Sequence, residues 1–92
     1  MILYLEVECT IYASFSLKDK RSVIKRMIAK LRKDFNVSVA ELEFQELWQR
    51  AKLGIVTISN ERLHAEQTLA AVIRTIDSFP EIERTITKQE II

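Results

Sequence analysis

Glycine, proline, cysteine, histidine and tryptophan each occur only once in the 92 residues. A single glycine excludes glycine-rich phosphate loops and dinucleotide-binding fingerprints, which need several. One Cys and one His are too few for a zinc site, whose ligands come mostly from these residue types. Cys9 has no partner for an internal disulfide and is best interpreted as a small core hydrophobe. Because Gly and Pro are so scarce, we expect a single compact domain over residues 1–92.

Long apolar runs are missing too. No stretch approaches the roughly 18 apolar residues of a membrane span. The N-terminus lacks the basic start of a signal peptide, so we expect a cytoplasmic protein without a membrane partner. Glu6 and Glu8 could pair as acid/base groups or metal ligands, but no second ligand set accompanies them, and His64 is expected at the surface. We therefore predict no enzyme activity, no catalytic or metal site, no cofactor and no small-molecule substrate.

Hydrophobic periodicity predicts the secondary structure. Residues 2–12 alternate strictly between apolar and polar, which is typical of a strand with one buried face. Segments 37–44 and 49–59 read as further strands, and 82–92 as a weaker one. Apolar residues recur every three and four positions between 16 and 35 and again between 60 and 79, which predicts two helices.

Terminal signals bound these helices. Ser16 and Asp19 have the spacing of a capping box, and Asn36 is expected to end the first helix in a left-handed conformation. Asn60 is expected to cap the second helix, and Pro80 to end it. The resulting β-α-β-β-α-β order predicts an α+β, ferredoxin-like sandwich: a four-stranded antiparallel sheet with two helices on one face.

The opposite sheet face would then be uncovered. Segment 49–59 is apolar on both faces, which suggests cover on both, and we expect a homo-oligomer, most simply a dimer. Trp48 is the only tryptophan, and the usual burial of Trp favours a plug at one end of the core over an interface anchor. The residues assigned to this hypothetical interface are Tyr4, Tyr12, Trp48, Val56 and Ile58.

Positive charge is concentrated in the first helix. Residues 18–34 hold eight Lys and Arg against two Asp, a net +6 in a chain whose total is +1. A basic face without acidic partners one turn away repels itself, and a polyanion such as RNA would relieve that repulsion. The simpler interpretation is a solvated helix face. The candidate phosphate-binding residues are Lys18, Arg21, Lys25 and Arg32 in one stripe, with Arg26, Lys30 and Lys33 beside it.

An RNA-recognition motif shares the predicted element order but stacks bases on aromatic residues of its open sheet. Segment 49–56 has no such aromatics, and Glu6 and Glu8 would repel phosphate. The sequence therefore argues against that module. The hypotheses left open are an RNA- or ribosome-associated accessory factor and an oligomeric module for protein interaction. A small-molecule enzyme or sensor using Glu6, Glu8 or Arg50 is the least favoured.

Three motifs carry a resemblance to a known family. They are Ser16–Arg21 (SLKDKR), Phe35–Glu41 (FNVSVAE) and Leu47–Ala51 (LWQRA), the last followed by Leu53-Gly54. In this order they closely resemble the bacterial YlxP-like family of unknown function, over essentially the whole chain. Phe44 and Glu46 depart from the His and Asp expected there, which argues against a polar role for that turn. The resemblance implies a ferredoxin-like fold and no established activity; the family's genes often lie near translation-initiation and ribosome-maturation genes, which favours the RNA hypothesis slightly.

Overall fold

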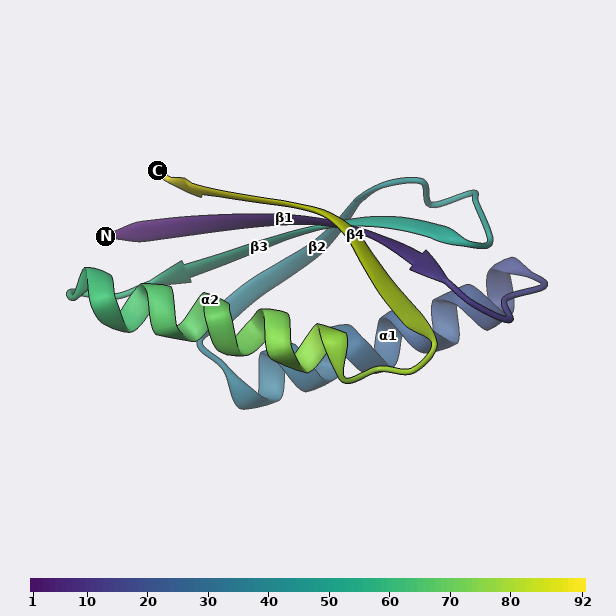
Figure 1. Cartoon of the computed structure of the whole chain (residues 1–92), viewed down its shortest axis with the longest axis horizontal. Coiled ribbons are helices and arrows are strands. Elements are labelled where there is room, and N and C mark those ends of the chain that lie inside the picture. Colours follow the sequence, from purple (N-terminus) through teal and green to yellow (C-terminus); the bar gives the residue numbers. More distant parts are fainter.

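The fold follows the predicted order of elements. The computed structural model describes all residues, 1–92, and has four strands and two helices (Figure 1). Every predicted strand ends within one residue of its observed bounds. The elements are β1 (Ile2–Ile11), α1 (Leu17–Asp34), β2 (Val37–Glu43), β3 (Arg50–Ile58), α2 (Arg62–Asp77) and β4 (Ile82–Ile91).

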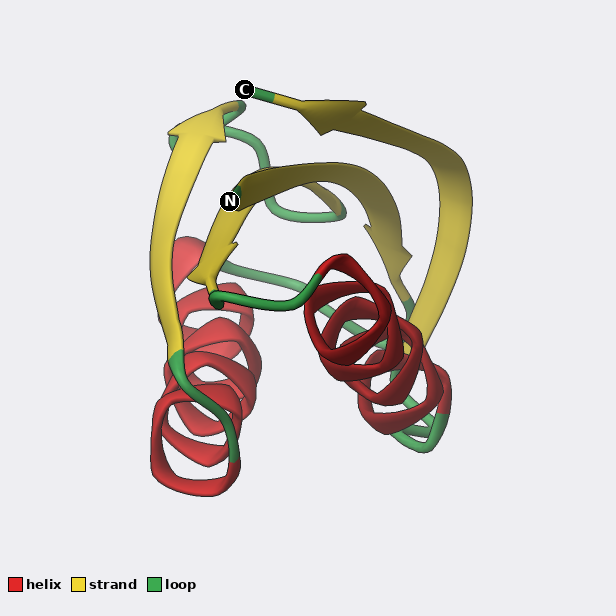
Figure 2. Ribbon diagram, turned by 90° about the vertical axis from the view of Figure 1, so that its left-hand side faces the viewer, coloured by secondary structure: helices red, strands yellow, loops and turns green.

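The strands form one antiparallel sheet in the order β2-β3-β1-β4. Both helices lie against the same face of this sheet, and the other face is open (Figure 2). The two central strands are thus β1 and β3, while β2 and β4 are edges. This is the α+β, ferredoxin-like sandwich that the sequence predicts.

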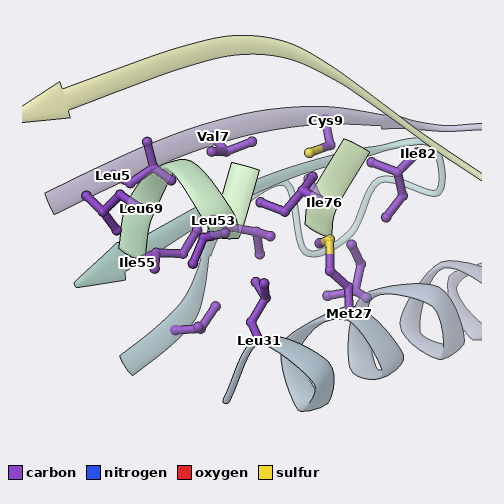
Figure 3. Packing of buried hydrophobic residues seen from close by; sticks show 14 of the residues in the cluster. Leu5, Val7, Cys9, Met27, Leu31, Leu53, Ile55, Leu69, Ile76 and Ile82 are labelled. Atoms are coloured by element: carbon purple, nitrogen blue, oxygen red, sulfur yellow. The ribbon is translucent and has the colours of Figure 1, made fainter. Parts of the chain in front are cut away.

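The core fills the space between sheet and helices (Figure 3). Alternate residues of β1 point into it, as the period of two requires. The helices present the apolar stripes expected from their periodicity, and Cys9 is fully buried among them, where burial raises the pKa of its thiol to about 12. The buried hydrophobic residues are Leu3, Leu5, Val7, Cys9 and Ile11 from β1, Ile24, Met27 and Leu31 from α1, Ala51, Leu53 and Ile55 from β3, and Ala65, Leu69, Val72 and Ile76 from α2, with Val39 and Ile82.

The start of α1 confirms its predicted cap. The Ser16 hydroxyl accepts a hydrogen bond from the Asp19 amide at 3.1 Å. The Asp19 carboxylate reaches back to the Phe15 amide, also at 3.1 Å, one residue before the position of a standard capping box. These bonds satisfy free amides where the chain enters the helix.

Two other predicted caps are wrong. Asn36 is not left-handed: its side chain instead donates to the Ile58 carbonyl at 3.3 Å, and the helix ends at an extended Phe35. Asn60 does not cap α2, because Glu61 occupies that position and its amide is bonded to the Ser59 hydroxyl. The end of β3 thus provides the partner of Asn36, and the Ser59 hydroxyl serves the start of α2 in place of Asn60.

Candidate functional site

The exposed face of α1 carries most of the predicted phosphate-binding residues. Helical periodicity turns its apolar stripe to the core and the basic residues outward. Four of these residues are exposed and make no ion pair and no side-chain hydrogen bond within the chain. They are Lys18, Arg21, Lys25 and Lys33.

The other three candidates are engaged within the fold. Arg26 pairs with Glu81 just before β4, and Lys30 pairs with Asp34 at 3.0 Å. Lys30–Asp34 is an i,i+4 pair, so the expectation that the basic face lacks acidic partners one turn away is wrong at that position. Arg32 donates to the Val39 carbonyl at 2.8 Å, which ties α1 to β2. Arg32 still adds positive potential because its partner is neutral, whereas the charges of Arg26 and Lys30 are largely offset by their acidic partners.

A shallow groove of about 570 Å³ runs between α1 and the edge strand β2. Arg21, Lys25 and Arg32 line it above an apolar floor that includes Ile28. The structure thus brings three members of the main predicted stripe together along one concave surface. A chain of phosphates lying there would meet several cations at once.

Lys20 is the one basic residue of α1 that is not among the candidate phosphate-binding residues. Its side chain is only 1% exposed, and its ammonium lies 3.0 Å from Glu41 Oε2. It also donates to the Phe44 carbonyl in the loop after β2. No hydrogen-bond donor reaches Glu41 Oε2 in good geometry, so Lys20 is the only cation beside that buried oxygen. Lys20 therefore holds α1 against β2 and its loop, and it is not available to an external ligand.

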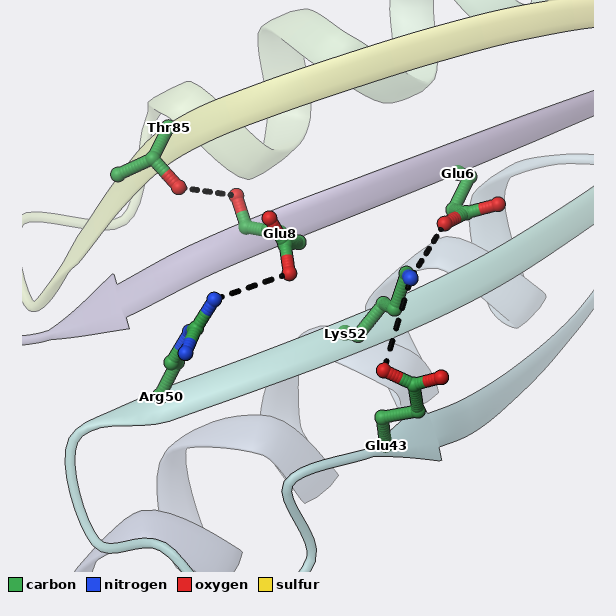
Figure 4. Close-up of polar contacts among 6 residues, drawn as sticks. All are labelled: Glu6, Glu8, Glu43, Arg50, Lys52 and Thr85. Atoms are coloured by element: carbon green, nitrogen blue, oxygen red, sulfur yellow. Dashed lines mark hydrogen bonds and ion pairs between the residues drawn. The ribbon is translucent and has the colours of Figure 1, made fainter.

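The open sheet face balances its own charges (Figure 4). Lys52 lies 2.8 Å from Glu6 and 3.6 Å from Glu43, and Arg50 lies 3.3 Å from Glu8. The hydrogen bond from Lys52 holds the pKa of the Glu6 carboxyl below its usual value, and the same bond raises the pKa of Lys52. The paired carboxylates expected on this face are thus neutralised by β3.

The five predicted interface residues do not form one surface. Tyr4 faces Val56 across the β1–β3 ladder, with Ile58 exposed at the end of β3. Tyr12 lies beyond the far end of β1, where its hydroxyl donates to Glu83. Trp48 lies in the loop between β2 and β3.

Trp48 is not a plug for the core. Its side chain is 52% exposed, so the favoured interpretation of this residue is wrong. Hydrogen bonds from Lys20 to the Phe44 carbonyl and from Gln49 to the Ser14 carbonyl fix the path of the loop that carries it. Trp48 instead lines an open hollow at the surface.

His64 is exposed, as expected. No group of three or more His, Cys, Asp or Glu residues could hold a metal ion. Neither helix has the length and apolar character to cross a bilayer.

Comparison with known proteins identifies the family of this chain. A family model described as "Protein of unknown function (DUF503)" matches residues 2–89. The chain belongs to this family. It is 49% identical over 90 residues to the "Uncharacterized protein YlxP" of Bacillus subtilis (strain 168), covering 98% of both chains. The resemblance carried by the three motifs is therefore confirmed.

Solved structures share the fold of this DUF503 protein. The designed protein Foldit4 matches with a TM-score of 0.60 at 14% identity, covering 99% of this chain and 98% of its own. A designed protein with a ferredoxin fold, LFR1 1, matches with a TM-score of 0.55 at 15% identity, covering 92% and 83%. Identities this low speak for the fold alone.

Proposed function

We propose that this protein binds RNA as an accessory factor, with the ribosome as the natural setting, through phosphate contacts on the exposed face of α1. The observation that carries the proposal is the set of four exposed cations without any partner in the chain, Lys18, Arg21, Lys25 and Lys33. An ion pair within the fold would have to be broken before it could serve a ligand, whereas these four side chains are free. Contacts of this kind position a nucleic acid without reading its sequence.

The groove beside α1 supports the same proposal. It gathers Arg21, Lys25 and Arg32 over about 570 Å³. From Lys18 to Lys33 the helix rises roughly 22 Å, at about 1.5 Å per residue. That length offers several successive phosphates a cation each. Affinity should therefore fall steeply with salt, because each phosphate contact releases condensed counterions.

The test measures binding to structured ribosomal RNA across a salt series. The variant R21E/K25E reverses two free cations in the groove. Its matched control, R74E/K88E, makes the same change in net charge at two exposed residues of α2 and β4 that form no ion pair. We expect a wild-type slope of about −3 in log K against log salt, from about four contacts. R21E/K25E should lose about tenfold or more in affinity and roughly two units of slope, while the control stays near wild type.

Equal losses in both variants would mean that only net charge matters, and the proposed site would be wrong. If wild type binds RNA weakly and R21E/K25E binds equally weakly, the exposed face of α1 is only a solvated surface. Both variants change exposed residues, so circular dichroism should show the same fold for each.

A second candidate function is a homo-oligomeric interaction module that uses the open sheet face. The favouring observation is that the side chains of Leu42 and Tyr4 both lie over Gly54, beside Val56 and the exposed Ile58. Sedimentation at micromolar concentration tests it with wild type and Ile58→Lys. A wild-type dimer that dissociates in Ile58→Lys would support this module, and a wild-type monomer would count against it.

A further inference from the structure

Exposed apolar side chains gather at one end of the molecule. Phe15 is 72% exposed, Trp48 52% and Leu47 46%. Phe15 belongs to the turn between β1 and α1, and the other two to the loop between β2 and β3; Figure 1 shows both segments at the same end. Together they line an open hollow of about 740 Å³. Exposed apolar side chains that gather at one place mark a candidate binding surface.

The walls of this hollow are fixed by hydrogen bonds between the two segments. Gln49 Nε2 donates to the Ser14 carbonyl at 3.0 Å, and the Ile11 amide donates to the Gln49 carbonyl at 3.0 Å. Phe44, at the start of the loop, has a φ of 68°, which is rare for a bulky residue. Its carbonyl accepts from both Lys20 and the Leu47 amide. The hollow is therefore held open by the fold.

The lining favours a flat, polar-edged ligand. Trp48 and Phe15 offer aromatic faces, and Arg50, whose guanidinium already stacks 4.0 Å from the Phe44 ring centroid, lies at the rim. Glu46 also lines the hollow. Its carboxylate would repel a phosphate but can accept a hydrogen bond from the amino group of a base. A nucleobase has both the π-face and the donor edge that this surface suits.

The hollow also continues the basic face of α1. Phe15 directly precedes Ser16, the cap of α1, and the free cation Lys18 follows in the first helical turn. A strand whose phosphates follow α1 would reach the hollow at the beginning of the helix. In a duplex the bases are stacked and paired, so only an unpaired base could enter.

We propose that this hollow binds one unpaired nucleobase of the RNA, stacked on Trp48 and Phe15. This inference rests on the proposed function and names its ligand as RNA with an unpaired segment. The site lies at the strand ends and in the loops, whereas an RNA-recognition motif would use the sheet face. A base site at the hollow would explain why Trp48, which does not contribute to the core, is exposed there.

The test uses the fluorescence of Trp48, the only tryptophan. A single-stranded RNA oligonucleotide is compared with an RNA duplex carrying the same number of phosphates. We expect the single strand to quench the fluorescence and the duplex to leave it unchanged. Trp48→Ala should weaken single-strand binding, measured by anisotropy of labelled RNA, by about tenfold to a hundredfold, as for loss of one stacked base. Duplex binding should change little.

Leu63→Ala is the matched control, because Leu63 is an exposed apolar residue of α2 far from the hollow in the chain. Phe15→Ala provides a second variant on the other wall and should reproduce the selective loss. Thermal unfolding checks that each variant is folded.

The outcomes separate this inference from the proposed function. If RNA binds, R21E/K25E weakens binding by about tenfold or more, and Trp48→Ala leaves binding unchanged, the base site is overturned and the helix site stands. The proposal of an unpaired base would also be overturned if Trp48→Ala lost equal affinity for duplex and single strand, or if both RNAs quenched the fluorescence of Trp48. If wild type binds neither RNA, both proposals fail.

Discussion

The open sheet face and the exposed face of α1 differ in whether their charges are paired. On the open sheet face Lys52 lies between Glu6 and Glu43, and Arg50 lies against Glu8. On α1, four cations have no partner at all. A chain with a net charge of only +1 thus has one surface whose charges are paired and nearly balanced and one that is strongly positive.

This difference has a consequence for partners. Charges paired at 2.8 to 3.6 Å largely cancel each other's field in the surrounding water. Unpaired charges of one sign add their potentials and steer oppositely charged molecules toward them. The helix face is therefore the surface on which we propose that a polyanion binds, while the ion pairs of the sheet serve the fold.

The largest expected effect concerns the one cation of α1 that belongs to neither surface. Lys20→Ala removes the only cation beside Glu41 Oε2 and leaves that carboxylate partly buried, since Glu41 is 23% exposed. Breaking such a pair costs about 3 kcal/mol of unfolding free energy, toward the lower end of the range for buried pairs because of that exposure. Chemical denaturation followed by circular dichroism measures it.

Lys18→Ala is the control, since Lys18 is two residues away, exposed and unpaired. Its effect should stay within about 0.5 kcal/mol. The double variant K20M/E41L, which replaces both charges by apolar groups, should recover part of the lost stability. Equal effects at positions 18 and 20 would show that Lys20 is an ordinary surface cation.

Lys20 also shows what sequence patterns could have revealed. It lies four residues before Ile24 and seven before Met27, so it falls on the buried stripe of α1. A polar residue in that register was the available signal, but its partner Glu41 is 21 positions away in the sequence. Only the packing of α1 on β2 brings the two together. Local patterns were sufficient for the strands, the helices and the Ser16 cap, whose determinants lie within a few residues.

The loop carrying Trp48 could not have been predicted in the same way. Its path depends on Phe44 in a left-handed conformation, which residue preference disfavours. Bonds from Lys20 and between Gln49 and Ser14 fix that path, and these partners are 24 and 35 positions apart. General burial preferences therefore placed Trp48 inside, whereas long-range contacts hold it outside.

A smaller effect is expected on the open sheet face, and it depends on pH. The pKa of Glu6 is lowered in the folded protein, chiefly by its hydrogen bond from Lys52. Its stabilising contribution is therefore present above the unfolded pKa, near 4.5, and is lost as the pH falls through the lower folded value. Lys52→Met should lower the melting temperature at neutral pH, and the gap to wild type should narrow on acidification below about pH 4.5.

Lys88→Met provides the comparison on the same sheet face. Lys88 forms no ion pair and lowers the pKa of Glu6 less than Lys52 does. Its melting temperature should stay closer to that of wild type at neutral pH. If the difference in melting temperature between Lys52→Met and wild type is constant with pH, the ion pair with Glu6 does not stabilise the fold.

The smallest expected effect concerns the positive surface in the absence of any RNA. Lys25→Glu replaces a free cation by an acid one helical turn from Arg21, so repulsion becomes attraction. The variant should be more stable than wild type by a few tenths of a kcal/mol, about 0.3, at low salt. At about 1 M salt the Debye length shrinks to about 3 Å and the gain should vanish. Lys25→Gln, which only removes the charge, should show about half the gain. A loss of stability in Lys25→Glu at low salt would mean that the cations of α1 do not repel one another. The helix face and the sheet face would then differ in the arrangement of their charges, but the unpaired cations of α1 would not destabilise the fold.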